Sequence, residues 1–150
     1  MKFRVQQWGI VGMAIATSFL AVSCAGGKAS ECASMIKVVN QTVTDTKDIT
    51  AAGTKGDIAT IEKLVGIFDK AAKDLDSVSL KDEQLKTYKG QFLMMYQSAT
   101  EINKQLVASI KERKATKVME GLRKSRDTFS PESNLATGLT QYCKAPEKQN

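Results

Sequence analysis

The sequence predicts an all-α protein, an up-down-up-down bundle of four helices in which the fourth helix is broken near Pro131. Apolar residues recur every three or four positions from Ser30 onward, which is the period of an amphipathic helix. The chain has only two prolines, and no segment alternates apolar and polar residues as a half-buried strand does. Short connections between the helical segments favour an antiparallel bundle, because each helix turns back directly onto its neighbour.

The first two helices are predicted on either side of a connection that contains two glycines. The first begins at Ser30 and has small or apolar residues in steps of four and three: Cys32, Ile36, Val39, Val43 and Thr46. Gly53, Thr54 and Gly56 are expected to end it, since glycine stabilises a helix less than any residue except proline. The second helix carries one apolar stripe, formed by Ile58, Ile61, Val65, Phe68, Ala72 and Leu75.

The third and fourth helices follow a turn with the sequence SLKD. Ser79 is the expected cap of the third helix, and Asp82 and Glu83 place negative charge at its positive end. Its stripe is the longest in the chain: Leu85, Tyr88, Phe92, Met95, Ala99, Ile102, Leu106 and Ile110. FSPES divides the fourth helix, with Ser130 as the expected cap and Pro131 at the first helical position of the second half. The apolar positions of the two halves are Val118 and Leu122, and then Leu135, Leu139 and Tyr142.

Residues 1–23 have the layout of a secretory signal peptide. Lys2 and Arg4 flank the start of the chain, and the largely apolar run WGIVGMAIATSFLAV and small residues follow. A membrane-spanning helix needs about 20 apolar residues, so this run is short for a permanent anchor. We therefore expect export followed by cleavage, with a retained membrane anchor as the alternative.

Residues 20–24, LAVSC, resemble the lipobox of bacterial lipoproteins. The resemblance implies that the signal is cut before Cys24, whose sulfur carries a diacylglycerol and whose new amine carries a further acyl chain. Ala21 stands where the family most often has leucine. Two or three acyl chains hold a protein on a membrane almost permanently, whereas one chain binds only marginally. The alternatives are an ordinary signal peptide that ends at Cys24, or a free thiol there.

The lipobox resemblance also implies a location. A lipoprotein is anchored in the cell envelope on the non-cytoplasmic side of a membrane, either in the periplasm or at the surface. Ala25 follows the cysteine in place of the aspartate that often retains lipoproteins in the inner membrane, which favours the outer membrane if the host has two. No cofactor is expected beyond the covalent lipid, and export argues against a nucleic-acid partner.

Once Cys24 is assigned to lipid, Cys32 and Cys143 are the remaining cysteines. An even pair in an exported protein predicts a disulfide, because that environment is oxidising; two buried free thiols are the alternative. In an up-down-up-down bundle, the two ends of the domain meet at one pole, where these cysteines can bond. The predicted organisation is a signal peptide at 1–23, a lipidated tether at 24–30, a helical bundle at 31–144 and a disordered tail at 145–150.

The segment KDEQLKTYKGQFLMMYQ, residues 81–97, together with the flanking cysteines is similar to small helical lipoproteins of cyanobacteria. The similarity covers most of residues 31–143 and supports the helical fold. It implies no particular activity.

The sequence lacks the residues that common catalytic and metal sites require. Histidine is absent, which removes the commonest general base and metal ligand. The chain has no CxxC, phosphate-binding loop or GxSxG motif, and its inward stripes are apolar rather than carboxylate-bearing as di-iron bundles require. We therefore predict no catalytic residue, no metal site and no enzymatic activity.

Two surfaces are candidates for binding a partner. FLMMY, residues 92–96, is apolar all round, so Leu93 and Tyr96 widen the stripe of the third helix; either this helix packs on two sides, or a partner or lipid-like ligand contacts that face. Seven basic residues lie between positions 111 and 126 against two acidic ones: Lys111, Arg113, Lys114, Lys117, Arg123, Lys124 and Arg126. They form either a solvated helix face or a binding surface for an acidic protein, an anionic envelope polymer or lipid headgroups.

These features predict a non-enzymatic, membrane-anchored envelope lipoprotein that binds a protein or assists a membrane complex. A small-molecule or lipid binder, with a cavity between helices near residues 92–96, is the first alternative. A surface antigen or structural spacer is the second. The basic residues lie away from the tether in the predicted bundle, which favours a protein partner over the lipid beneath.

Overall fold

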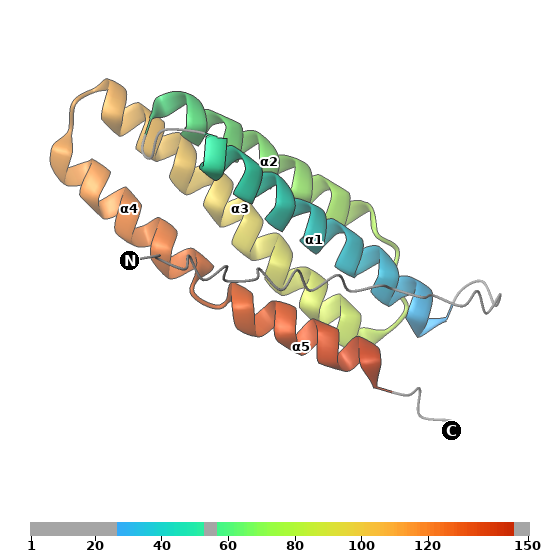
Figure 1. The fold of residues 1–150 in the computed structure, drawn as a ribbon. Helices are drawn as coiled ribbons and strands as arrows, with labels where there is room; N and C mark the ends of the chain where they lie inside the picture. The colour runs from blue at the N-terminus through green and yellow to red at the C-terminus, as the bar shows by residue number, and fades with distance from the viewer. Residues whose placement is uncertain (1–26, 53–56, 146–150) are drawn as a thin grey trace, which may run out of the picture.

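The computed structural model describes residues 27–52 and 57–145, and every regular element in these segments is an α-helix (Figure 1). The helices are α1 (Lys28–Ala52), α2 (Ile58–Ser77), α3 (Glu83–Lys111), α4 (Ala115–Phe129) and α5 (Glu132–Lys144). The predicted all-α class is therefore confirmed, with the fourth predicted helix divided into α4 and α5. The predicted signal peptide, the lipid site at Cys24 and the tail from residue 146 lie outside the described residues.

Helix α3 forms the centre of the helical bundle. It packs against α2, and also against α4 and α5, which follow each other along its length (Figure 1). Helix α1 packs on α2 and α5 and covers the core from the remaining side. The largest fully buried side chains come from α1, α2, α3 and α5: Met35, Leu75, Leu85, Phe92, Tyr96 and Leu139.

Helix α1 begins earlier, and buries a slightly different face, than the sequence predicted. The Gly27 carbonyl accepts hydrogen bonds from the backbone N–H groups of Ser30 and Glu31 at 3.0 and 3.3 Å, so residues 28–30 are helical rather than part of a tether. The predicted stripe included Ile36 and Val43, which are only half-buried. The helix instead buries Cys32, Met35, Val39 and Thr42.

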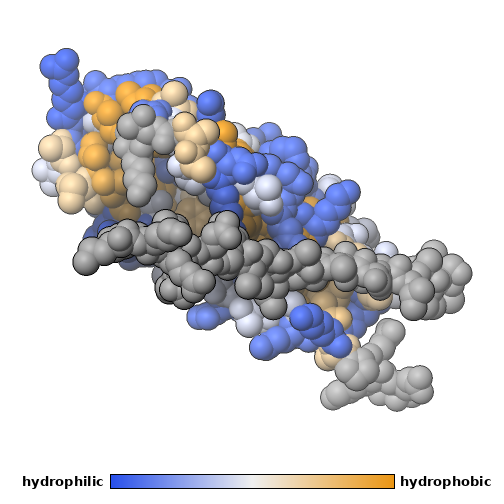
Figure 2. Space-filling view, in the orientation of Figure 1, coloured by the Kyte–Doolittle hydropathy of each residue, from blue (hydrophilic) through white to orange (hydrophobic). Residues whose placement is uncertain are grey.

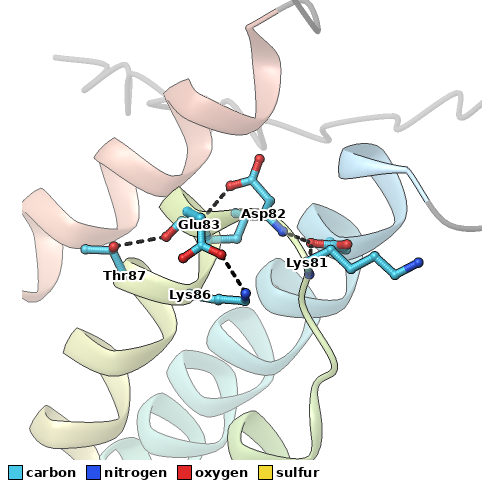
Figure 3. Close-up of polar contacts among 7 residues, drawn as sticks. Lys81, Asp82, Glu83, Lys86 and Thr87 are labelled. Atoms are coloured by element: carbon cyan, nitrogen blue, oxygen red, sulfur yellow. Dashed lines mark hydrogen bonds and ion pairs between the residues drawn. The ribbon is translucent and has the colours of Figure 1, made fainter.

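The start of α3 is capped by Asp82 and not by the predicted Ser79. An oxygen of the Asp82 carboxylate accepts the backbone N–H of Leu85 at 2.9 Å. The Glu31 carboxylate of α1 accepts the N–H groups of Lys81 and Asp82 at 3.0 and 3.1 Å, which fixes the chain just before the helix (Figure 3). Ser79 precedes this N-cap by three residues.

The fourth predicted helix breaks where expected, but by a different arrangement of caps. Helix α4 ends at Phe129 and α5 begins at Glu132. Ser130 keeps a helical backbone and its N–H donates to the Asp127 carbonyl at 3.3 Å, so it closes α4 and does not cap α5. Pro131 takes the N-cap position without a capping side chain. Because proline has no N–H, it cannot continue the hydrogen bonds of α4.

One end of the bundle, which we call the disulfide pole, joins the start of α1, the start of α3 and the end of α5. Cys32 and Cys143 lie at disulfide distance, with sulfurs 2.13 Å and Cα atoms 5.7 Å apart across 111 residues of sequence. The Lys28 ammonium lies 3.9 Å from the centre of the Tyr142 ring. The Tyr142 hydroxyl donates to the Asp82 carboxylate at 2.7 Å. The predicted cysteine pairing is thus matched by the structure.

Candidate functional site

The seven basic residues predicted as a binding surface lie at the end of α3, in the connection after it and along α4. All seven are exposed. Four of them form ion pairs with described residues: Lys111 with Glu62 at 2.9 Å, Lys124 with Glu120 at 2.8 Å, Arg123 with Asp127 at 3.5 Å, and Lys114 with Glu112. Because exposed pairs of this kind contribute less than about 1 kcal/mol each, they neutralise charge more than they stabilise the fold.

The other three basic residues, Arg113, Lys117 and Arg126, have no ion pair with any residue that the structure describes. Hydrogen bonds from neighbouring lysines lower the pKa of Glu112 and the pKa of Glu120. Both acids therefore stay ionised at neutral pH and keep their lysine partners. Arg113, Lys117 and Arg126 are the cations left available to an external anion.

Arg113 adopts a backbone conformation that is unusual for a residue with a side chain. Its φ is 56°, in the left-handed region, where glycine is the common residue. Its N–H donates to the Ile110 carbonyl at 3.0 Å and the Lys114 N–H donates to the Ser109 carbonyl at 2.9 Å. These two bonds are the Schellman motif that ends many helices. The motif turns the chain from α3 into α4 and places Arg113 at the corner.

Helix α4 is held more shallowly than the other helices. None of residues Ala115–Phe129 is buried, and the helix packs chiefly against α3. At Gly121 its backbone comes close to α3, since an added Cβ would lie 3.3 Å from Leu106 Cδ1. Met119 is 67% exposed and Leu122 is 47% exposed. The α4 surface, by which we mean the seven basic residues with Met119 and Leu122, therefore presents apolar and cationic side chains together.

A second apolar cluster packs against the inner side of α4. It lies at the end of the molecule where α3 gives way to α4, and Figure 2 shows apolar residues gathered there with hydrophilic residues around them. The cluster consists of Ile58, Ile61, Leu106, Val107, Ile110 and Val118. Val118 is the contribution of α4, and it is only half-buried. The cluster fixes the position of α4 without covering its outer flank.

The prediction that Tyr96 contacts a partner is wrong. Tyr96 is 0% exposed and its ring stacks on Phe68, with centroids 6.0 Å apart. Leu93 is half-buried and packs against the main core, so little of its side chain is available to a partner. Met94 is the residue of the FLMMY segment that faces solvent, at 70% exposure. Phe92, Met95 and Tyr96 are buried because α3 packs against several other helices.

A cavity of about 280 Å³, which we call the interhelical cavity, lies between α1 and α4. All five helices contribute to its lining. Its apolar wall is formed by Val43, Leu64, Phe68 and Phe129, and its polar groups are Thr46, Lys47, Asn103, Ser125 and Glu132. The rings of Phe68 and Phe129 lie 5.0 Å apart between centroids. A separate hollow of about 340 Å³ lies beside residues 92–96, where the sequence predicted a cavity, and Met94 and Met95 form part of its lining.

Three polar side chains of the interhelical cavity lack partners in the described part of the chain. Asn103 is only 5% exposed and its amide makes no hydrogen bond there. The Thr46 hydroxyl is buried and also unpaired. Glu132 is half-buried without an ion pair, and burial raises its pKa. Buried polar groups are normally hydrogen-bonded, so this grouping distinguishes the cavity from ordinary packing defects.

The sequence analysis did not identify the polar residues of the interhelical cavity, although the sequence contains one indication of them. Asn103 falls inside the apolar stripe of α3, between Ala99 and Leu106. A polar side chain at a core position needs a partner, and that requirement could have marked Asn103. The remaining lining residues come from separate helices, so no local pattern connects them.

The chain was compared with known proteins. No family model, curated protein or solved structure matches it. None of the helices in residues 27–52 and 57–145 is both long and apolar enough to cross a membrane. The same segments contain no group of three or more cysteine and acidic side chains placed to hold a metal ion.

Proposed function

We propose that the protein is a non-enzymatic lipoprotein of the cell envelope, anchored through lipid on Cys24, whose α4 surface binds an acidic segment of another protein. The observation that carries the proposal is the state of α4. This helix buries none of its residues, yet it holds Met119 and Leu122 exposed beside cations without partners. An exposed apolar flank on an otherwise well-packed domain is typical of an interaction site.

The proposal includes an up-down-up-down course for the helices, with α4 and α5 together as the fourth. It is supported by the contacts of α1 with α2, α2 with α3, and α5 with α1. The 29 residues of α3 span about 43 Å at 1.5 Å per residue. The connection at Arg113 would then lie about that far from the disulfide pole.

The lipid anchor gives this arrangement an orientation. Three residues lie between Cys24 and Lys28, where α1 begins, so the two Cα atoms are at most about 14 Å apart. The disulfide pole would therefore stay near the membrane, on the non-cytoplasmic side, and the start of α4 would point away from it. An anionic partner that meets Arg113 and Lys117 would come from the envelope space or from an opposing structure.

An acidic protein segment matches the α4 surface better than a polyanion alone. Arg113, Lys117 and Arg126 offer charges that steer an acidic partner during encounter. Met119 and Leu122 offer apolar contact area, which a simple anionic polymer cannot use. A protein segment that carries both acidic and apolar side chains would pair with the cations and also cover the two apolar residues.

Site-specific photocrosslinking in intact cells tests the partner. A photoreactive residue at position 119 should capture one reproducible acidic protein, while the same residue at exposed Asn40 on α1 should not. The double variant Lys117→Glu, Arg126→Glu should lose that product, and the matched variant Lys37→Glu should keep it. Recovery of lipid alone, or the same captured proteins from both positions, would contradict the proposal.

The lipid anchor needs its own experiment. The Cys24→Ser variant should incorporate no labelled fatty acid and should accumulate as an uncut precursor. Normal processing of this variant would show that the lipobox prediction is wrong, whatever the outcome of the crosslinking.

A further inference from the structure

We propose that the interhelical cavity binds a small organic amine with a flat apolar body, packed against the paired rings of Phe68 and Phe129 with its amine near Glu132. The cavity lies on the side of α4 that faces α1, and its lining residues are separate from the basic residues of the α4 surface. The inference therefore goes beyond partner binding and does not depend on it.

The size and wall of the cavity select the body of the ligand. At about 280 Å³ it is just below the range of about 300–1,000 Å³ that is usual for small-molecule sites. Val43, Leu64 and the two phenylalanines form an apolar wall. The phenylalanine rings meet at 39° with centroids 5.0 Å apart, so they offer ring faces and edges to an aromatic guest. One or two fused rings fit this space.

The unpaired polar groups select the charged end. Asn103 is 95% enclosed, lines the cavity and has no hydrogen-bond partner in the described chain. The Thr46 hydroxyl is likewise buried and unpaired. The Glu132 carboxylate has no cation within ion-pair distance among the described residues. Together these groups offer more acceptors than donors, which suits a ligand that donates several N–H bonds.

An amine explains the grouping better than an anion or a neutral hydrocarbon. An anion would be repelled by Glu132, and a hydrocarbon would leave Asn103 and Thr46 unsatisfied. An ammonium group would form a charge-assisted hydrogen bond with Glu132 and would also interact with the aromatic faces. Lys47 also lines the cavity, but its exposed side chain can stay in solvent.

Equilibrium dialysis with two matched probes tests the proposal. The full chain in lipid nanodiscs is dialysed against tryptamine or against indole-3-propionate, which has the same ring and a carboxylate instead of the amine. Empty nanodiscs provide the blank. Tryptamine should bind with saturation, and indole-3-propionate should not. No saturable tryptamine binding up to millimolar concentration, or equal binding of both probes, would overturn the proposal.

Three variants locate the binding. Glu132→Gln should weaken tryptamine binding about tenfold or more, since a charge-assisted bond is worth about 1.5–3 kcal/mol. Asn103→Leu should also weaken it, and circular dichroism confirms that this variant stays helical. Asp76→Asn removes the same charge from an exposed position on α2 outside the cavity lining and should leave binding unchanged. Equal affinity in wild type and Glu132→Gln would refute the placement of the amine.

Discussion

The Tyr142 hydroxyl donates a 2.7 Å hydrogen bond to the Asp82 carboxylate, across 60 residues of sequence and one residue before Cys143. The other oxygen of this carboxylate accepts the Leu85 N–H at the start of α3. One side chain thus caps α3 and joins it to the end of α5. The bond from Tyr142 is the main cause that lowers the pKa of Asp82, and the charge of Lys28 adds to it.

Replacing Tyr142 by phenylalanine should remove this bond and keep the ring. We expect the pKa of Asp82 to rise toward its usual value and the free energy of unfolding at pH 7 to fall by about 1 kcal/mol. A lowered pKa stabilises the fold above the unfolded value of about 3.9, and that stability is lost as the pH falls through the folded pKa. Wild type and variant should therefore converge in acid. Carboxyl NMR titration and urea unfolding measure both effects; an unmoved Asp82 pKa would contradict the assignment.

Breaking the disulfide should destabilise the domain strongly. In Cys143→Ser the half-buried position tolerates a hydroxyl, so the loss reports mainly the missing crosslink. We expect the free energy of unfolding to fall by about 2–5 kcal/mol, because the link closes a long loop in the unfolded chain. Reduction of wild type should give a similar loss, while reductant should not affect the variant. Two free thiols in the untreated protein would refute the bond.

Arg113→Gly should stabilise the protein. Glycine reaches the left-handed conformation of this corner without the steric cost that a side chain brings, so we expect a gain of up to about 1 kcal/mol. Arg113→Lys, which keeps both the charge and the cost, should leave the free energy of unfolding unchanged. If the glycine variant also loses the crosslinked partner and the lysine variant keeps it, partner binding needs the positive charge at position 113, despite the cost of its left-handed backbone. Thermal unfolding of the three proteins gives the comparison.

Two glycines in helices should respond to alanine in opposite directions. At Gly90 an added Cβ meets nothing within 4 Å, so Gly90→Ala should stabilise by about 0.5–1 kcal/mol. At Gly138 the same atom would lie 2.8 Å from the Tyr88 hydroxyl, and Gly138→Ala should destabilise by about 1–3 kcal/mol. The matched pair tests the packing of α5 on α3. Equal gains from both substitutions would show that the contact at Gly138 is loose.

Glu132→Gln should stabilise the empty protein at neutral pH. Burial raises the pKa of Glu132, which means that its ionised form is less stable in the fold than in the unfolded chain. The penalty is absent below the usual pKa of about 4.3 and appears as the pH rises through the folded value. The variant should therefore exceed wild type at pH 7 and equal it below about pH 4. Exposed Glu101→Gln is the control and should show no such difference.

Helices α1, α2, α3 and α5 were predictable because the side chains that they bury set the spacing of their apolar residues. The break before α5 was predictable because Pro131 removes a hydrogen-bond donor wherever it lies. The cap of α3 was not, because Glu31 of α1 fixes the chain at Lys81 and so decides where the helix starts. That is a tertiary contact between residues 50 positions apart, and local capping preference cannot reveal it.

The candidate site was predictable only in part for the same reason. The basic residues of α4 are a local feature and were found from the sequence. Tyr96 was misjudged because a run that is apolar all round fits a buried helix as well as an exposed one, and only the positions of the neighbouring helices decide between them. The cavity around Asn103 depends on five helices at once.

The shallow seat of α4 has a kinetic consequence. Its two ends are secured differently: α3 holds one through a short corner, and the crosslinked α5 holds the other. We expect α4 to open locally from the rest of the bundle and to return, while both of its ends stay attached. Its amide hydrogens should exchange with deuterated solvent well before those of α2 and α3, and each opening would briefly uncover both Leu106 beneath it and the entrance beside Phe129.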